Sequence, residues 1–328
     1  MLRQITGMSC SVSLMLLGAL QVWSQTVGTA RVTDVTPLTV RYPNGPAVTV
    51  RNPLPARPLQ ALVIRHLDGA IVRTYQAPAL DRWPLNVEIT QPGKDRLLEL
   101  VKGDDVPIPF TLLVVNERGE VEAAAEFSVL VTAPGWKTGM DLPSGPDWPL
   151  TYAAKGKYTA LKDDALFVDA AESYRFKVAE TTEFTKAGTV RRMSDIHTAD
   201  ISAGEHVGIV YAKSQGIDVA LLVWSWSDLA RSSPRRLMTG ARFYIGTVTD
   251  IKAAVPKQGG EFIVHTKMSQ ASMQWLVTRT TEVLSGMVKA APERITQETL
   301  VAVGADEVKG SPIPAVRILL LKDLSGSP

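Results

Sequence analysis

The C-terminal half of the chain contains an internal repeat, and this repeat limits the possible folds more than any other feature. Residues 174–184 align without gaps on residues 273–283, and both segments contain Thr-Thr-Glu. Three further pairs of segments keep the same order along the chain: 156–159 with 246–249, 201–212 with 295–305, and 219–223 with 316–320. Each copy comprises about 75 residues of short strands, which cannot cover both faces of an open sheet. We therefore expect each copy to close into a small β-barrel.

Short motifs in the first copy suggest a family. A strand ends in Thr-Thr-Glu at 181–183, a one-turn segment Met-Ser-Asp-Ile follows at 193–196, and Gly-Glu-His-Val at 204–207 predicts a kink before the next strand. Together with the apolar closing strand, these motifs resemble the repeats of bacterial domain of unknown function family 5666. The resemblance implies tandem OB-like barrels in an exported protein, and it implies no activity, because the family has none assigned. In the second copy, Gln-Glu-Thr-Leu at 297–300 replaces the Gly-Glu-His-Val segment.

The first half of the chain has a different strand pattern. Between residues 36 and 132, short aliphatic runs alternate with turn signals at intervals of about ten residues. The clearest run, at 110–115, leads into the turn Asn-Glu-Arg-Gly-Glu at 116–120, and an alternating strand follows it, which predicts a hairpin. This spacing is typical of an antiparallel sandwich of about 100 residues, and the segment resembles a bacterial immunoglobulin-like domain.

The N-terminus has the order of a secretory signal peptide. Arg3 precedes an apolar run over residues 8–20, and small residues stand before a cleavage point that we predict after Ser24. The run is shorter than the roughly 20 apolar residues that a membrane-spanning helix needs, so we expect no transmembrane span after cleavage. Cys10 is the only cysteine, so the mature chain is expected to contain no disulfide and no thiolate metal site.

These patterns predict an all-β protein with an N-terminal immunoglobulin-like sandwich and two small OB-like β-barrels. The predicted segments are the signal peptide (1–24), the immunoglobulin-like β-sandwich (25–132), a Pro/Gly-rich linker (133–149), the first OB-like barrel (150–226), a linker (227–240) and the second OB-like barrel (241–324). One conflict concerns residues 281–291, whose apolar residues have helical spacing although the repeat predicts a strand there. We favour a strand to about Val283 and then a short helix.

The sequence offers no recognisable catalytic centre. It contains no Gly-x-Ser-x-Gly elbow, no Ser-x-x-Lys box, no phosphate-binding glycine-rich loop and no dinucleotide fingerprint. Four histidines are spread over all three units without metal-binding spacing, and the neighbouring Asp195, His197, Asp200 and His206 fit solvated loop positions. We therefore predict no catalytic residue, no metal and no cofactor, and a protein that is not an enzyme.

Five residues form a candidate ligand surface. Trp224 and Trp226 alternate on one strand and therefore lie on one of its faces. Such a pair could stack sugars or bases, or it could seal the barrel against a neighbouring unit, which we favour. The nearby arginines, Arg231, Arg235 and Arg236, could attract an anionic polymer, although we favour a solvated linker.

The sequence predicts an exported, non-catalytic binding or scaffolding protein of a bacterial cell envelope, whether periplasmic, at the cell surface or secreted. Its partner would be another envelope protein or a polysaccharide. Thirty-five basic and 33 acidic residues leave a net charge of +2, which argues against a nucleic-acid partner. The alternative is carbohydrate or anionic-polymer binding through the two tryptophans and the basic linker.

Overall fold

The computed structural model describes residues 31–32, 35–37, 39–42, 47–51, 60–88, 100–102, 105–131, 151–170, 173–186, 189–192, 201–225, 242–253, 261–268 and 271–325. The predicted signal peptide, the two predicted linkers and the one-turn segment 193–196 lie outside these residues. The described residues are strands joined by turns, with short 3-10 turns such as η1 (Ala79–Asp81) and η4 (Pro292–Arg294). The predicted all-β class is confirmed.

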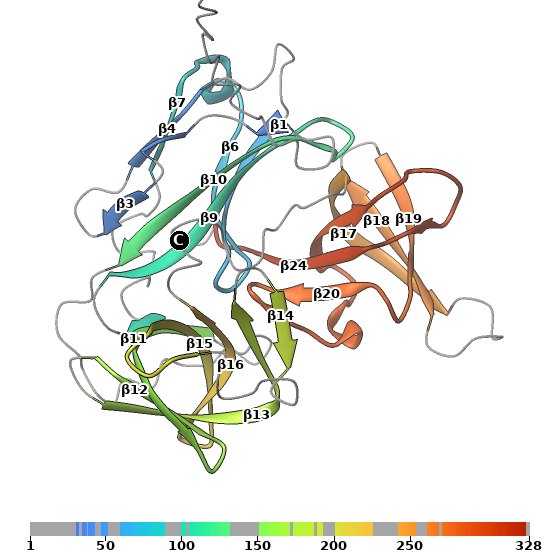
Figure 1. The fold of residues 1–328 in the computed structure, drawn as a ribbon. Helices are drawn as coiled ribbons and strands as arrows, with labels where there is room; N and C mark the ends of the chain where they lie inside the picture. The colour runs from blue at the N-terminus through green and yellow to red at the C-terminus, as the bar shows by residue number, and fades with distance from the viewer. Residues whose placement is uncertain are drawn as a thin grey trace, which may run out of the picture.

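The N-terminal unit consists of two layers of strands (Figure 1). The larger layer contains β1 (Arg31–Val32), β3 (Thr39–Tyr42), β5 (Gln60–Arg65), β6 (Ala70–Tyr75), β9 (Val106–Val115) and β10 (Val121–Val131). The smaller layer contains β2 (Val35–Thr36), β4 (Ala47–Val50) and β7 (Leu85–Glu88). The hairpin predicted around residues 116–120 is confirmed, since β9 and β10 pair antiparallel and the Asn116 amide donates to the Glu120 carbonyl.

Strand β9 shows why the N-terminal unit does not stand alone. All ten of its residues are buried, whereas a strand with one solvated face would alternate between buried and exposed positions. Phe110 and Leu112 face a core shared with β4 and β7. Leu113 and Val115 face a second core, which contains residues from the C-terminal unit. The central sheet is therefore covered on both faces.

The middle unit is a closed five-stranded barrel. Its strands are β11 (Thr151–Lys162), β12 (Ala165–Asp169), β13 (Ser173–Lys186), β15 (His206–Ser214) and β16 (Ile217–Ser225). They pair in the circuit β11-β12-β13-β16-β15 and back to β11, and only the β13–β16 pair among them is parallel. Strand β14 (Thr189–Arg192) forms a hairpin with the end of β13. Closure pairs both long edges of the sheet, as expected for so short a unit.

The C-terminal unit follows the same circuit with two interrupted strands. Its strands are β17 (Arg242–Ala253), β18 (Phe262–Met268), β19 (Ala271–Val277), β20 (Glu282–Ser285), β21 (Val288–Lys289), β22 (Leu300–Ala305), β23 (Ile313–Pro314) and β24 (Arg317–Asp323). Strands β19 and β20 together take the place of β13, and β23 and β24 take the place of β16. Both units therefore close through one parallel crossing.

The Thr-Thr-Glu segments occupy equivalent positions in this crossing. The Thr182 hydroxyl accepts a hydrogen bond from the Ala179 amide at 2.9 Å and donates to the Ala220 carbonyl at 2.7 Å. The Thr281 hydroxyl makes the same two contacts, with the Thr278 amide at 2.9 Å and the Ala315 carbonyl at 2.7 Å. In each unit the hydroxyl of the middle threonine therefore links a backbone amide three residues earlier in the chain, where the strand pairing is irregular, to a carbonyl of the neighbouring parallel strand.

These contacts also correct the predicted alignment of the repeats. Because Ala220 corresponds to Ala315, the closing strand 219–223 matches 314–318, two residues away from the predicted 316–320. Similarly, the Gly204 amide donates to the Tyr158 carbonyl and the Glu298 amide to the equivalent Val248 carbonyl, both at 2.8 Å. Gly204 and Glu298 both have positive φ. The kink is therefore shifted by one residue from the predicted pairing, because tertiary hydrogen bonds, and not residue similarity, fix the register.

The short helix predicted after Val283 is wrong. Strands β20 and β21 form a hairpin there, and Gly286 turns it with a φ of 59°. Val283, Leu284 and Met287 are all buried, although the segment is not helical. Their burial comes from neighbours on both sides of the hairpin, because Met287 belongs to the core that the N-terminal unit shares with the first barrel and Val283 belongs to that of the second barrel.

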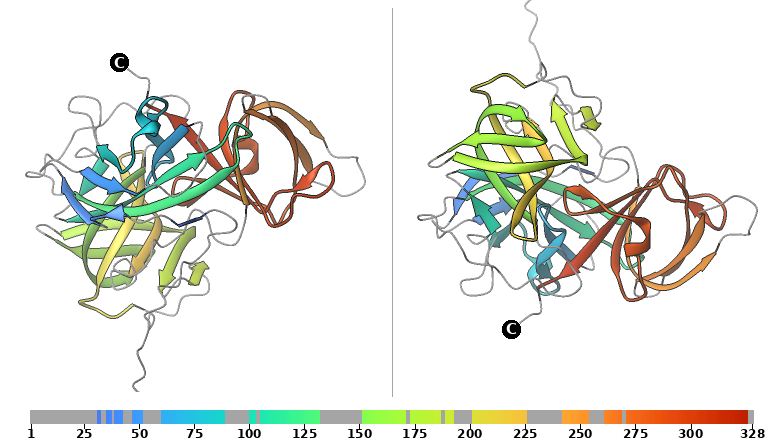
Figure 2. Two further views of the ribbon diagram at one scale, coloured as in Figure 1. Left: turned by 90° about the horizontal axis from the view of Figure 1, so that it is seen from above. Right: turned by 90° about the horizontal axis from the view of Figure 1, so that it is seen from below.

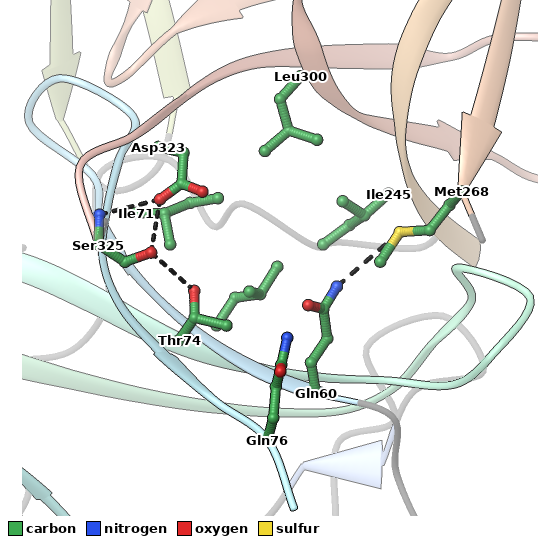
Figure 3. A pocket seen from close by; sticks show the side chains of 10 residues that line it. Gln60, Ile71, Thr74, Gln76, Ile245, Met268, Leu300, Asp323 and Ser325 are labelled. Carbon is green, nitrogen blue, oxygen red and sulfur yellow. Dashed lines mark hydrogen bonds between the residues drawn. The ribbon is translucent and has the colours of Figure 1, made fainter. Parts of the chain in front are cut away.

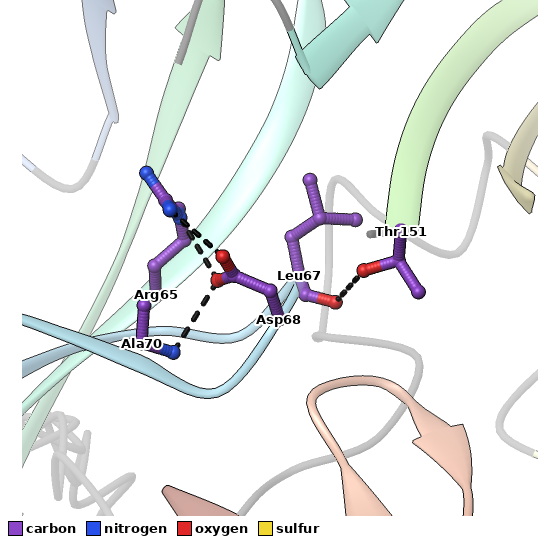
Figure 4. Close-up of polar contacts among 5 residues, drawn as sticks. All are labelled: Arg65, Leu67, Asp68, Ala70 and Thr151. Atoms are coloured by element: carbon purple, nitrogen blue, oxygen red, sulfur yellow. Dashed lines mark hydrogen bonds and ion pairs between the residues drawn. The ribbon is translucent and has the colours of Figure 1, made fainter. Parts of the chain in front are cut away.

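Shared sheets join the three units (Figure 2). Strand β24 runs from the second barrel to the edge of β6, where the Lys322 amide donates to the Gly69 carbonyl at 3.1 Å. Strand β8 (Val101–Lys102) pairs with β11 of the first barrel. The Thr151 hydroxyl of that barrel donates to the Leu67 carbonyl at 2.9 Å, beside the turn that the Arg65–Asp68 ion pair closes (Figure 4). The sequence predicts units joined by linkers, whereas the folded units also share strands.

Candidate functional site

Because its partner Gly208 shares a strand face with the exposed His206, Trp224, the first residue of the predicted ligand surface, lies on the outer side of the wall of the first barrel. Its side chain is 1% exposed and belongs to the continuous core. The ring covers Gly208 on the neighbouring strand, where a Cβ atom would lie 2.1 Å from the indole Cε2. This arrangement supports the packing role and leaves no ring face open to a ligand. Trp226, Arg231, Arg235 and Arg236 lie outside the described residues.

His66 is a buried polar residue of the N-terminal unit. Its Nε2 atom lies 2.6 Å from the Thr111 hydroxyl, and its amide donates to the Pro109 carbonyl at 2.9 Å. Burial lowers the pKa of His66 to about 3, so the ring is neutral at physiological pH. No group of three or more potential metal-ligating side chains occurs in the described ranges. His66 is therefore a hydrogen-bonded core residue.

An open pocket of about 480 Å³ lies between the N-terminal unit and the second barrel (Figure 3). Strands β5 and β6 form one wall, and β17, β18, β22 and β24 form the other. Its lining residues are Gln60, Leu62, Ile71, Thr74, Gln76, Ile245, Met268, Leu300, Asp323 and Ser325. The pocket exists only because the two units meet, since their residues are distant in sequence.

A polar rim surrounds the apolar floor of this pocket. The Ser325 hydroxyl donates to Asp323 Oδ1 at 2.6 Å, and the Thr74 hydroxyl donates to Ser325 Oγ at 3.1 Å. On the opposite side, Gln60 Nε2 lies 3.9 Å from the Met268 sulfur, a weak contact. Of the lining side chains, Asp323 alone is an acid or base. The arrangement can hold a small polar ligand by amide and hydroxyl hydrogen bonds, and it offers no acid–base pair.

The outer face of the first barrel carries a group of basic residues that sequence reasoning did not select. Lys157, Arg175 and Lys177 are exposed on β11 and β13, and the Arg175 guanidinium lies 5.8 Å from the centre of the Phe167 ring. Their spacing is the available signal, because Arg175 and Lys177 are two residues apart on one strand and therefore share a face. The antiparallel pairing of β12 with both β11 and β13 brings Lys157 and Phe167 onto that face.

Comparison with known proteins gives no assignment. No protein-family model and no curated protein matches the chain. A solved structure described as "Molecular basis for abrogation of activation of pro-inflammatory cytokines" aligns with 57% of this chain and 96% of its own, at 10% sequence identity and a TM-score of 0.14. This similarity is too weak to carry an argument about fold. The resemblance to bacterial family 5666 stays a prediction from its motifs.

In the portion of the chain that the structure describes, no helix is long and apolar enough to cross a bilayer.

Proposed function

We propose that this protein is an exported, non-catalytic binding or scaffolding component of a bacterial cell envelope. The order of charge, apolar run and small residues at the N-terminus supports export to the periplasm, the cell surface or the medium. Its partner would be an envelope protein or a polysaccharide. The proposal includes an immunoglobulin-like N-terminal unit and two OB-like barrels, supported by the two-layered first unit and by the five-strand circuit with one parallel pair.

One observation carries this proposal: the three units are locked together by backbone contacts. Strand β24 belongs to the second barrel and also extends the N-terminal sheet. Gly69 and Gly286 allow two turns to meet so closely that a Cβ atom on Gly286 would lie 2.4 Å from the Leu67 carbonyl oxygen. A rigid assembly of this kind holds several surfaces at fixed distances from each other, which suits a scaffold.

An ion pair between the two barrels adds to this locking. Glu183 of the first barrel is buried and lies 3.3 Å from Lys289 Nζ of the second. At the equivalent position of the second barrel, Glu282 pairs within its own unit, with Arg317 Nε at 2.7 Å. Glu282 has Arg317 opposite it on the parallel strand of its own barrel, whereas Glu183 has the uncharged Leu222 at the corresponding position. The cation that pairs with Glu183 therefore comes from the other barrel.

Export can be tested with a reporter fusion. Residues 1–30 would be fused to an alkaline phosphatase that lacks its own signal and is active only after export from the cytoplasm. We expect an active fusion in a Gram-negative host, and loss of activity when Leu16 and Leu17 in the apolar run are both replaced by Arg. An inactive parent fusion would contradict export.

The scaffold can be tested by unfolding the purified mature chain in urea. Because the cores and sheets are shared, we expect circular dichroism and tryptophan fluorescence to report one coincident transition. Separate transitions for separate units would contradict a locked assembly.

A further inference from the structure

We propose that the outer face of strands β11, β12 and β13 binds an anionic polysaccharide through Lys157, Arg175 and Lys177. We call this surface the basic face. The inference rests on the proposed function, because it names the chemical class of the partner for a binding protein. It is independent of the predicted basic linker, since all residues of the basic face lie on strands of the closed barrel.

Strand pairing places the cations in a compact array. Phe167 stands opposite Arg175, and Ala165 stands between Lys162 on one neighbouring strand and Lys177 on the other. Strands are about 4.8 Å apart and alternate residues about 6.8 Å apart, so the array measures roughly 10 by 14 Å. A segment of an anionic polymer of about that length could therefore contact several of the cations at once.

The cations of the basic face are available to a ligand. Among the described residues, Lys157 and Lys177 form no ion pair, and Arg175 is positioned over the half-buried Phe167 ring. The acidic residue on the face, Asp169, accepts a hydrogen bond from the Ser173 hydroxyl at 2.7 Å. Two further acids, Asp163 and Asp164, lie in the β11–β12 turn at the edge of the array.

The second barrel shows that closure of the barrel does not require this charge. Its pairing places Thr247 at the position of Lys157, Gln274 at that of Arg175 and Leu276 at that of Lys177. Lys252 of the second barrel corresponds in position to Lys162 of the first, and it forms an ion pair with Asp250 at 3.2 Å. Two units with the same strand circuit therefore differ in this surface, which indicates a role beyond folding for the charges of the first barrel.

The chemistry of the face favours a polysaccharide over nucleic acid or a membrane. Stacking of bases needs an open aromatic face, whereas Arg175 lies over the half-buried Phe167 ring. Insertion into a membrane needs exposed apolar side chains, and the large ones in the described ranges are Ile217 and Val316, which lie on other strands or turns. A hydrophilic polymer that carries carboxylate or sulfate groups needs only the cations, of which Arg175 can form a bidentate contact.

The test compares two triple variants of the mature chain with equal changes in net charge. The first, Lys157→Thr, Arg175→Gln and Lys177→Gln, removes the basic face and places at positions 157 and 175 the residue types that the second barrel has there. The control, Lys252→Gln, Lys267→Gln and Lys309→Gln, removes three exposed cations of the second barrel. Circular dichroism and urea unfolding verify that both variants are folded. Calorimetric titration then measures binding of heparin fragments, polygalacturonate, neutral dextran and single-stranded DNA.

We expect the parent chain and the control to bind heparin or polygalacturonate, and the basic-face variant to bind about tenfold or more weakly, with an affinity that falls between about 50 and 300 mM salt. Neutral dextran should not bind. Absence of binding at low salt, equal loss in both variants, or tighter binding of single-stranded DNA would each overturn the inference. These outcomes do not depend on the export fusion or on cooperative unfolding, so failure here is distinguishable from failure of the proposed function.

Discussion

The indole ring of Trp224 lies over the α-carbon of Gly208, its partner on the neighbouring antiparallel strand. The same two positions of the second barrel hold Ala302 and Leu319, which also face each other across the strand pair. The two barrels therefore fill this position differently. In the first barrel the large Trp224 side chain lies opposite a glycine, and in the second the smaller Leu319 side chain lies opposite the methyl group of Ala302.

This relationship predicts a strong dependence of one substitution on the other. Gly208→Ala should lower the free energy of unfolding by about 2 to 3 kcal/mol, because the new Cβ atom would overlap the indole. In a Trp224→Leu background the same substitution should be close to neutral, as in the second barrel. Urea unfolding of the four proteins gives both values, and an equal penalty in both backgrounds would contradict the packing account.

His66 predicts a pH-dependent contribution to stability. Burial lowers its pKa from 6.5 to about 3, so the folded state resists protonation while the unfolded state accepts it. This contribution is fully present above pH 6.5 and is lost as the pH falls toward 3, by about 1.4 kcal/mol per pH unit. A His66→Gln variant lacks this titration, so its stability should approach that of the parent as the pH falls.

Urea unfolding of the parent and the His66→Gln variant between about pH 7.5 and 4.5 checks this expectation. The comparison removes the effect of other titrating groups, which both proteins share. Two parallel curves of stability against pH would show that the buried ring does not titrate as the geometry requires.

The contact between the turns at Gly69 and Gly286 predicts a steric dependence of the assembly. Gly286→Ala should cost about 3 kcal/mol, because a Cβ atom would lie 2.4 Å from the Leu67 carbonyl oxygen and because φ is 59°. Gly310→Ala is the matched control, since φ there is 83° and nothing lies within 4 Å of the added atom. That change should cost about 1 kcal/mol. If urea unfolding shows the same loss of stability for Gly286→Ala and Gly310→Ala, the close contact between the two turns is contradicted.

The middle threonines of the repeat predict equal effects in the two barrels. Thr182→Val and Thr281→Val each remove a hydroxyl that serves one amide and one carbonyl, so each should cost about 2 kcal/mol. The exposed neighbour Thr181 provides the control, and Thr181→Val should stay within about 0.5 kcal/mol of the parent. Thermal or urea unfolding measures the stability of all three variants. A large loss of stability in only one barrel would contradict the equivalence of the two threonines.

The sequence by itself determined the features that depend on neighbouring residues. Alternation of apolar and polar side chains gave the strands of the all-β class, and a turn with Gly119 at a φ of 80° gave the hairpin of β9 and β10. The Thr-Thr-Glu segments marked equivalent crossings because each middle threonine bonds the backbone three residues before it. Such contacts leave a local pattern in the chain.

Only the tertiary structure decided which strand faces become buried by another unit. The helical spacing around Leu284 and Met287 arises from a hairpin with neighbours on both sides, and β24 extends the edge of β6 across 252 positions from Ala70 to Lys322. Likewise, the pocket joins Gln60 to Met268, and the Trp224 ring is buried against the barrel wall because Gly208 leaves space for it. Contacts between distant residues depend on how whole sheets pack, and the sequence near each residue carries no record of that packing.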